Sequence, residues 1–238
     1  MRAGDGRLLV NEVFGPTVQG EGVSLGRPAV FLRLAHCNLT CTFCDTPYTW
    51  DWRRYATRNE AHAMPIAEIA SDIRRRIEPL VRLLVITGGE PMLQQPSILL
   101  LLDLLRDLGR LPDVEIETNG TIAPSEELTR QVSRFNVSVK PSSAGMTGRR
   151  RMRPDAISAL SETNKAVWKF VISDASDVLE VEEFVDRFEV EPVFLMPEGT
   201  TSDQLNAKYE LVTRACIKNG WTVTPRLHIH IWGDKRGV

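Results

Sequence analysis

Three of the four cysteines in the chain lie close together and share the spacing CxxxCxxC, as Cys37, Cys41 and Cys44. Thiolates are the usual protein ligands of iron–sulfur clusters, and three of them can hold a four-iron cluster while one iron stays open. A structural zinc site would need a fourth protein ligand, usually from a second pair of cysteines, which the sequence lacks. The spacing therefore predicts a [4Fe–4S] cluster whose open iron can take part in chemistry.

The fourth cysteine, Cys216, lies far from the others in a helical pattern at residues 209–219 that ends at Gly220. Asn followed by Gly is a common helix end. A lone cysteine in a helix usually behaves as a small hydrophobic residue. We therefore expect Cys216 to be buried and to bind no metal.

Runs of apolar residues alternate with helical patterns along the chain. The helical pattern that begins near Pro65 repeats isoleucine on one face as far as Ile77. The run at 83–87 is apolar almost throughout and is stopped by Gly88 and Gly89, as expected for a strand buried in a parallel sheet. Strands joined through helices imply right-handed crossovers and a parallel sheet. The predicted strands are residues 30–34, 83–87, 114–118, 137–140, 167–172 and 193–196.

This order places the three clustered cysteines directly after the first predicted strand and the glycine pair directly after the second. In parallel α/β folds, the loops at the carboxyl ends of the strands carry the chemistry. We therefore expect the cluster and its neighbouring groups to lie at that edge of the sheet.

The composition favours a small-molecule substrate over nucleic acid or a membrane surface. The chain has 29 Lys and Arg against 31 Asp and Glu, so it carries no strong overall charge. The longest apolar stretch, at 98–102, is too short to span a bilayer, and no cationic leader precedes an apolar run. Clustered free thiols favour a reducing compartment. We therefore expect a cytoplasmic protein.

The cysteine spacing, with Phe43 before the third cysteine, resembles that of the radical S-adenosylmethionine (SAM) superfamily. Further motifs are similar to those of the 7-carboxy-7-deazaguanine synthase family: QGEG at 19–22, the segment at 26–34, CDT at 44–46, TGGEP at 87–91 and ETNG at 117–120. The resemblance implies a lyase that converts 6-carboxy-5,6,7,8-tetrahydropterin to 7-carboxy-7-deazaguanine with loss of ammonia, in 7-deazapurine (queuosine-type) biosynthesis. The cluster and SAM would supply the radical chemistry.

Six main strands are too few for a closed eight-stranded barrel. The resemblance implies an α/β fold of the partial (β/α)6 radical SAM barrel type. We expect a single domain over residues 1–238, with the cluster loop at 35–46. The helices should be fewer and shorter than in a full barrel, because little sequence separates residues 140 and 167 once the stretch at 142–154 is assigned to a loop.

The resemblance also implies which residues hold SAM. The GGEP element would contact the methionine part of SAM, because glycines let the backbone approach a ligand closely. Polar residues at the ends of the next two strands would add contacts, with Ser138 near the ribose. The implied SAM-binding residues are Phe43, Gly88, Gly89, Glu90, Glu117, Asn119, Ser138 and Lys140.

Substrate contacts are assigned to a different set of residues. Gln19 and Glu21 suit the guanine-like edge of a pterin, because an amide and a carboxylate together offer acceptors and donors. Arg33 suits a substrate carboxylate through two parallel hydrogen bonds. An ion pair with Asp or Glu is the competing interpretation of a charged residue in this apolar strand. Thr87 could add a hydroxyl to the substrate.

The resemblance further assigns His228 to the substrate. His230 lies two residues later and would face the same side of a strand. The sequence therefore leaves open which of these two histidines acts.

Asp45 and Thr46, directly after the last clustered cysteine, resemble a family element in which the threonine hydroxyl helps to bind Mg²⁺. Mg²⁺ keeps several waters and takes few protein ligands, so one hydroxyl with substrate oxygens is chemically reasonable. We assign Thr46 as the Mg²⁺ ligand and Asp45 as a supporting turn residue.

Three further segments carry charge or aromatic rings. The basic stretch at 148–154 is interpreted as a mobile solvated loop, because it has no aromatic partners and the chain is not basic overall. The arginines at 74–76 lie at a helix end, where cations complement the dipole. The aromatic segment at 50–55 either walls the cavity or covers the end of the sheet.

Two other functions share part of this pattern. A radical SAM activase that acts on a partner protein would share the cysteines but would not need Gln19, Glu21 and Arg33. A zinc-binding module would need His36 as a fourth ligand, in a strained chelate with the adjacent Cys37. As partners, the resemblance implies an external electron donor such as flavodoxin or ferredoxin, and a second copy in a homodimer.

Overall fold

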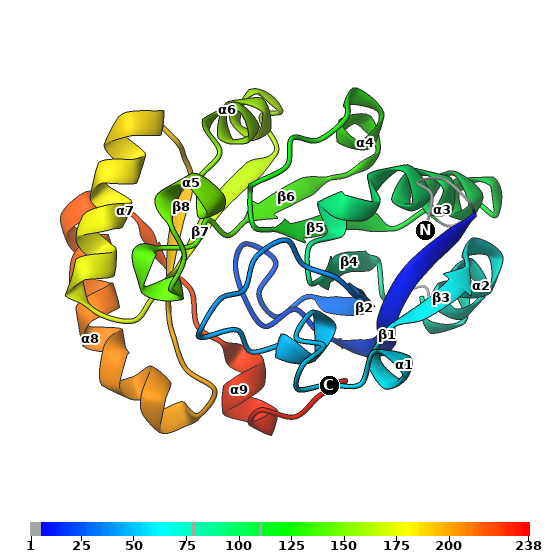
Figure 1. Ribbon diagram of the computed structural model, residues 1–238, viewed down its shortest axis with the longest axis horizontal. Coiled ribbons are helices and arrows are strands. Elements are labelled where there is room, and N and C mark those ends of the chain that lie inside the picture. The colour runs from blue at the N-terminus through cyan, green and yellow to red at the C-terminus, as the bar shows by residue number, and fades with distance from the viewer. Residues whose placement is uncertain (1–5, 78–79, 110) are drawn as a thin grey trace.

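Nine strands form one open sheet in the computed structural model, which describes residues 6–77, 80–109 and 111–238. The strand order is β3-β1-β2-β4-β5-β6-β7-β8-β9, and the strands from β2 onward run parallel to one another. Helices lie around the outside of this arc of strands (Figure 1). The prediction of an open α/β barrel is therefore confirmed.

The six predicted strands are all present, with a seventh parallel strand at the end. The predicted strand at 137–140 is displaced toward the N-terminus, so Ser138 and Lys140 follow it. The parallel strands are β2 (Pro28–Leu34), β4 (Leu83–Gly88), β5 (Asp113–Thr118), β6 (Arg134–Val137), β7 (Ala166–Ile172), β8 (Val193–Pro197) and β9 (Thr222–Val223).

Two antiparallel strands were not predicted. β1 (Arg7–Val18) pairs with β2, and β3 (His62–Pro65) pairs with β1. Gly15 and Pro16 interrupt the apolar pattern of β1, and the pairing register shifts between Phe14 and Thr17. Because Pro lowers the strand signal and a shifted register breaks strict alternation, the sequence pattern does not mark this strand.

Helices connect each pair of consecutive parallel strands. α4 and α6 are short, as expected, whereas α8 extends over 18 residues and ends before Gly220 as predicted. The helices are α1 (Thr57–Glu60), α2 (Ile66–Arg76), α3 (Gln95–Asp107), α4 (Glu126–Gln131), α5 (Gly148–Arg151), α6 (Pro154–Glu162), α7 (Ala175–Phe188), α8 (Ser202–Asn219) and α9 (Leu227–Trp232), with 3-10 turns η1 (Pro47–Thr49), η2 (Pro91–Gln94) and η3 (Ser142–Ala144).

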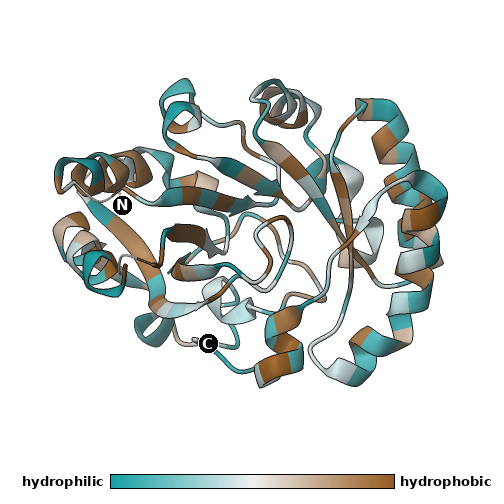
Figure 2. Ribbon diagram, turned by 180° about the vertical axis from the view of Figure 1, so that it is seen from behind, coloured by the Kyte–Doolittle hydropathy of each residue, from teal (hydrophilic) through white to brown (hydrophobic). Residues whose placement is uncertain are grey.

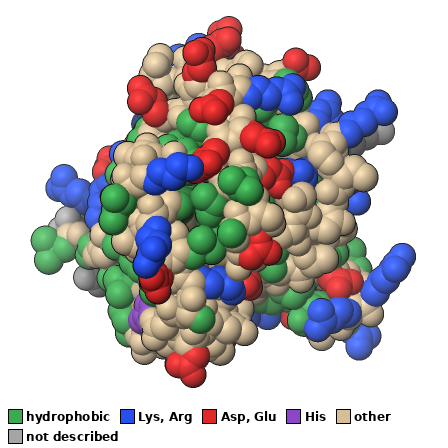
Figure 3. Space-filling view, turned by 90° about the vertical axis from the view of Figure 1, so that its left-hand side faces the viewer, with side chains coloured by type: hydrophobic (Ala, Val, Ile, Leu, Met, Phe, Trp, Pro, Cys, Tyr) green, Lys and Arg blue, Asp and Glu red, His purple; other side chains and the backbone are tan. Residues whose placement is uncertain are grey.

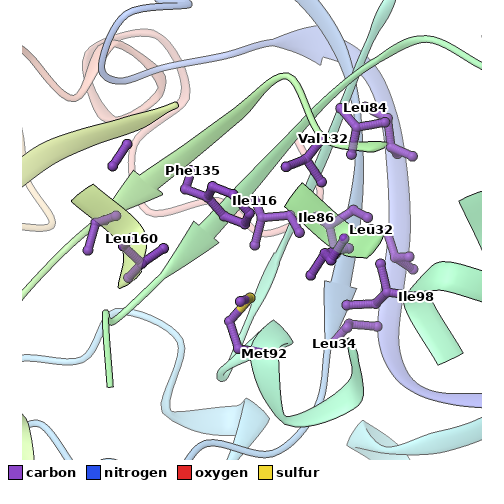
Figure 4. Packing of buried hydrophobic residues seen from close by; sticks show 14 of the residues in the cluster. Leu32, Leu34, Leu84, Ile86, Met92, Ile98, Ile116, Val132, Phe135 and Leu160 are labelled. Atoms are coloured by element: carbon purple, nitrogen blue, oxygen red, sulfur yellow. The ribbon is translucent and has the colours of Figure 1, made fainter. Parts of the chain in front are cut away.

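The main core lies between the outer face of the sheet and the helices. Leu32 and Leu34 of β2 and Ile86 of β4 point toward Ile98 of α3 (Figure 4). Strand residues alternate between the two faces, so the intervening positions, including Arg33, face the inside of the arc. The same alternation therefore builds the core and supplies the interior with side chains.

The surface carries charges of both signs. The helices show hydrophobic and hydrophilic stripes (Figure 2), and acidic and basic side chains are interspersed on the face formed by α7 and α8 (Figure 3). Within the described residues, none of the helices has the length and apolar character needed to cross a bilayer. Cys216 is buried in α8, at 2% exposure, as predicted.

The basic stretch at 148–154 is solvated as expected at Arg149, Arg150 and Arg153, which are exposed, but it is not a loop throughout. It begins with α5, and Arg151 is buried. The Nη1 atom of Arg151 donates to the Lys140 carbonyl at 2.8 Å and lies 2.5 Å from a carboxylate oxygen of Glu180. The prediction was wrong for Arg151, because the partner that neutralises it comes from α7, about thirty residues away in the sequence.

Leu32→Ala should lower the free energy of unfolding by about 2–5 kcal/mol, because Leu32 is fully buried and its truncation leaves a cavity. Ile217→Ala is the control, since Ile217 is 78% exposed and should change stability by less than about 0.5 kcal/mol. Urea unfolding under reducing conditions measures both. Equal losses in the two variants would contradict the packing described for β2.

Candidate active site

A cavity of about 240 Å³ opens at the carboxyl ends of the parallel strands. All predicted site residues except Glu90 contribute to its lining. Those residues are Gln19, Glu21, Arg33, Cys37, Cys41, Phe43, Cys44, Thr46, Thr87, Gly88, Gly89, Glu117, Asn119, Ser138, Lys140 and His228. The sequence motifs thus converge on one space, although they are spread over some two hundred residues of sequence.

The three clustered cysteines are free thiols and half-buried at the cavity wall. The backbone N–H of Leu39 lies 3.4 Å from Cys37 Sγ, and the indole N–H of Trp50 lies 3.3 Å from Cys44 Sγ. Burial raises the pKa of the Cys37 thiol to about 12, and the pKa of Cys41 is also raised. Metal binding requires thiolates and releases these protons. Three soft donors on one loop fit an iron–sulfur cluster.

The described side chains around these cysteines are not arranged as a preformed zinc site. In the described part of the chain, no group of three His, Cys, Asp or Glu side chains is placed to hold a single metal ion. The His36 ring lies instead against Trp52, at 5.6 Å between ring centroids. In an iron–sulfur cluster each thiolate binds a different iron, so the three need not converge on one point. The donor set therefore disfavours the zinc-binding alternative.

The glycine pair after β4 packs directly against the cysteine loop. The N–H of Gly89 donates to the Leu34 carbonyl at 3.0 Å, and the N–H of Glu90 donates to the His36 carbonyl at 2.7 Å. A Cβ atom on Gly89 would lie 1.9 Å from the His36 carbonyl oxygen. Glycine is therefore required here by close backbone approach, as predicted for this element.

Glu90 lies beneath the cavity and does not line it. Its side chain is fully buried and accepts hydrogen bonds from the N–H groups of Met92 (2.9 Å) and Asn119 (2.7 Å) and from the Thr118 hydroxyl (2.8 Å). Burial raises the pKa of Glu90 despite these bonds. Glu90 thus joins the glycine turn to the end of β5, and its contribution to a ligand is indirect.

Polar groups at the ends of β5 and β6 form another part of the wall. Asn119 Nδ2 donates to Asn38 Oδ1 at 2.9 Å, which connects it to the cysteine loop. Lys140 Nζ donates to Ser138 Oγ at 2.8 Å. These amide, hydroxyl and ammonium groups can bind the polar parts of a nucleoside-like cofactor.

Gln19, Thr87 and Glu117 form one hydrogen-bonded group. Gln19 Nε2 donates to Glu117 Oε1 at 3.1 Å, and the Thr87 hydroxyl donates to Glu117 Oε2 at 2.7 Å. Glu117 was assigned to SAM from the sequence, and the other two to the substrate. In the structure Glu117 orients both of them.

Glu21 is held between two buried cations. Lys169 Nζ donates to Glu21 Oε2, and Arg226 Nε donates to Glu21 Oε1 at 3.1 Å. Burial alone would raise the pKa of Glu21, but the two cations outweigh it and hold the pKa well below its ordinary value. Lys169 has a raised pKa for the same reason, since Glu21 outweighs its burial. Glu21 therefore faces the cavity as a carboxylate.

Arg33 both lines the cavity and forms the ion pair that was its competing interpretation. Its Nε donates to Glu12 Oε1 at 2.8 Å, and its guanidinium lies 5.3 Å from the centre of the Phe14 ring. Its two Nη atoms make no hydrogen bond with any residue that the structure describes. They remain available to an anion in the cavity.

The two histidines lie on one helix, where the sequence pattern predicts a strand. His228 and His230 lie on α9, where residues two apart point in different directions. His228 lines the cavity, whereas His230 is exposed and lies 3.1 Å from the Tyr209 hydroxyl. Burial lowers the pKa of His228. The structure therefore favours His228 as the histidine of the site.

The turn after Cys44 brings three more side chains to the cavity. The Thr46 hydroxyl makes no cap hydrogen bond and lies 3.7 Å from Cys44 Sγ. Asp45 forms an ion pair with Arg226. Trp50 lines the cavity, which supports the wall interpretation for that end of the aromatic segment.

Sequence reasoning missed Lys169 and Arg226. Lys169 interrupts the apolar run of β7, and the argument used for Arg33, that a charge in a buried strand needs a partner, would have found it. Arg226 lies outside any strand or helix run, so only its contacts identify it.

Comparison with known proteins identifies related chains. The radical SAM superfamily profile matches residues 33–158. The chain is 39% identical to the 7-carboxy-7-deazaguanine synthase of Pyrobaculum aerophilum, over 97% of both chains. It is 34% identical to the protein of that name from Halobacterium salinarum, over 97% of this chain and 93% of the relative.

The fold is also similar to a solved structure. The crystal structure of QueE from Escherichia coli matches with a TM-score of 0.67 and 26% identity, over 93% of this chain and 95% of that chain. The similarity therefore extends over nearly the whole described sheet and its helices.

The Glu21 ion pairs should make stability depend on acid pH. Because the pKa of Glu21 is lower in the folded state than its ordinary value of 4.5, the carboxylate stabilises the fold fully above that value, and this stabilisation is lost progressively as pH falls from there to the folded pKa. Between about pH 5 and pH 3, the wild type should lose more stability than Glu21→Gln, which cannot titrate. Urea unfolding at stepped pH measures this. Equal pH dependence in both proteins would contradict it.

Proposed function

Because this chain belongs to the 7-carboxy-7-deazaguanine synthase family of the radical SAM superfamily, we propose that it converts 6-carboxy-5,6,7,8-tetrahydropterin to 7-carboxy-7-deazaguanine with loss of ammonia. The observation that carries the proposal is the meeting of two residue sets in one cavity. The clustered thiols open onto the same space as the polar groups suited to a carboxylated pterin.

Cys37, Cys41 and Cys44 would hold the [4Fe–4S] cluster, and the backbone at Gly88 and Gly89 would approach SAM. When bound, the cluster and SAM supply the radical chemistry that removes a hydrogen atom from the substrate. The chain's own contribution is to bind, orient and exclude water. The residues proposed to complete the SAM site are Phe43, Asn119, Ser138 and Lys140.

The guanine-like edge of the pterin would bind at Glu21 and Gln19. A carboxylate kept ionised by two cations is a strong acceptor for the N–H groups of that edge. Gln19 is 3% exposed and already oriented by Glu117, so little entropy is lost when it binds. Thr87 and His228 would bind further polar atoms of the ring.

The substrate carboxylate would bind at the opposite end, near Arg33 and Thr46. The Nη atoms of Arg33 can donate two hydrogen bonds, since Glu12 occupies only its Nε in the described structure. The Thr46 hydroxyl would add one ligand to a Mg²⁺ that also binds substrate oxygens and water. A carboxylate between these cations would fix the ring relative to SAM.

The whole of residues 1–238 is proposed to act as one radical SAM domain in the cytoplasm, as a homodimer, with an external electron donor such as flavodoxin or ferredoxin as reductant. The continuous sheet and the coverage of relatives over nearly their full length support the single domain. Free thiols at the cavity support a reducing compartment.

The deciding experiment is anaerobic reconstitution with iron and sulfide, followed by incubation with SAM, Mg²⁺, reductant and the pterin. Mass and ultraviolet absorbance should identify 7-carboxy-7-deazaguanine. A reconstituted protein that cleaves SAM but leaves the pterin unchanged would exclude this substrate and favour an activase. A protein that binds no iron would exclude the radical SAM chemistry itself.

Arg33→Lys should raise the KM for the pterin about 30-fold, because loss of a bidentate hydrogen bond to a carboxylate costs about 2 kcal/mol. Cleavage of SAM without pterin should stay within about twofold of the wild type, since Arg33 is assigned to the pterin carboxylate and not to SAM. Steady-state kinetics measures the first and 5′-deoxyadenosine release the second. An unchanged KM would remove Arg33 from the substrate site.

A further inference from the structure

We propose that Arg226 is a positioning residue that connects the two ends of the substrate site. It would hold Glu21, which faces the guanine-like edge, and at the same time the Asp45–Thr46 turn, which faces the Mg²⁺ and carboxylate end. This inference rests on the proposed function for the identity of the ligands. The contacts of Arg226 carry it.

Each nitrogen of the Arg226 guanidinium has a different partner. Nε donates to Glu21 Oε1 at 3.1 Å, Nη1 donates to the Gly199 carbonyl at 2.6 Å, and Nη2 donates to Asp45 Oδ2. These partners lie in three separate segments: the loop after β1, the loop after β8 and the turn after Cys44. A planar guanidinium with fixed donors can join three such segments, whereas the single ammonium of lysine cannot reproduce this geometry.

The two carboxylates depend on Arg226 unequally. Glu21 also binds Lys169, so it keeps one cation if Arg226 is lost. Asp45 forms no other hydrogen bond or ion pair with a described side chain. Although burial would raise the pKa of Asp45, Arg226 holds it below its ordinary value. Among the described residues, Arg226 is thus the one hydrogen-bond and ion-pair partner of the Asp45 side chain, and one of two cations that donate to Glu21.

The position of Asp45 decides where its neighbours point. Asp45 lies between Cys44, a proposed cluster ligand, and Thr46, the proposed Mg²⁺ ligand. The turn continues through hydrogen bonds from the Thr49 N–H (3.0 Å) and hydroxyl (2.8 Å) to the Thr46 carbonyl. An anchor at Asp45 therefore fixes the backbone on which Thr46 presents its hydroxyl to the cavity, beside Cys44 Sγ.

Arg226 is itself rigidly held. The N–H of the next residue, Leu227, donates to the Gly20 carbonyl at 2.9 Å. A Cβ atom on Gly20 would lie 2.2 Å from His228 Nδ1, so α9 packs directly on the loop that carries Glu21. The Arg226 side chain is only 8% exposed. α9 lies between β1 and the start of α8 (Figure 1), and Arg226 directly precedes it.

The test compares Arg226→Lys and Arg226→Gln with Lys169→Met, which removes the other cation of Glu21, and with Arg214→Gln, which removes an exposed guanidinium paired to Glu210 on α8. Hydrogen exchange of peptides covering residues 44–50 is measured on the cofactor-free protein. On the reconstituted enzyme, pterin turnover is measured at varied pterin and Mg²⁺, and SAM cleavage is measured without pterin.

Both Arg226 variants should raise exchange at residues 44–50 about tenfold or more, because the hydrogen bond and ion pair that Arg226 gives Asp45 are weakened. They should raise the Mg²⁺ concentration for half-activation about tenfold. They should also lower kcat about 100-fold, because Glu21 and Thr46 are no longer held in position. Lys169→Met should raise the pterin KM but leave exchange at 44–50 and the Mg²⁺ requirement unchanged. Arg214→Gln should match the wild type throughout.

Asp45→Asn tests the Asp45–Thr46 end of the site without changing the contacts of Glu21. It also serves as a control for a general folding defect in the Arg226 variants. It should reproduce the faster exchange and the higher Mg²⁺ requirement while the pterin KM stays within about threefold of the wild type. The proposal is overturned if Arg226→Gln leaves exchange at 44–50 unchanged, or if Lys169→Met reproduces every effect of Arg226→Gln. If the wild type fails to convert the pterin, the proposed function fails, and the exchange data on Arg226 and Asp45 still decide the anchoring.

Discussion

The site depends on the pairing of charges that the sheet turns inward. Strand alternation sends Arg33, Glu117 and Lys169 to the inside of the barrel, where an unpaired charge would cost several kcal/mol. Each finds a partner there: Glu12 for Arg33, Gln19 and Thr87 for Glu117, and Glu21 for Lys169. Because these partners lie on loops and strands distant in sequence, the charges hold those segments in place around the cavity.

The same alternation along the strands places one set of side chains in the core and the other set in the cavity. In β2 the outward residues Leu32 and Leu34 pack under the helices, while Phe31 and Arg33 between and beside them line the cavity. In β7 Trp168 is buried in the core and Lys169 reaches Glu21. A shift of one residue in either strand would place a charge in the core and an apolar side chain in the cavity. Packing of the core therefore also fixes the orientation of the catalytic interior.

The sequence was sufficient for features encoded locally and insufficient for those made by distant contacts. The apolar runs identified all six main strands, and the cysteine and glycine motifs identified two adjacent loops. β1 was missed because Gly15 and Pro16 break its pattern, and the burial of Arg151 was missed because its partner Glu180 is on another helix. The histidines were placed on a strand because Leu-His-Ile-His alternates, yet the segment closes as a short helix against Gly20.

The dependence of the site on α9 has a consequence for biosynthesis. Arg226 is separated from Glu21 by 205 positions and from Asp45 by 181. A ribosome adds about 5–20 residues per second, so the cysteine loop emerges on the order of ten seconds or more before the side chain that closes its surroundings. During that interval the loop carries its three thiols, but Arg226 and α9 are not yet present beside it. Cluster insertion into a correctly shaped pocket therefore has to wait until α9 has been made and has packed on the loop that carries Glu21.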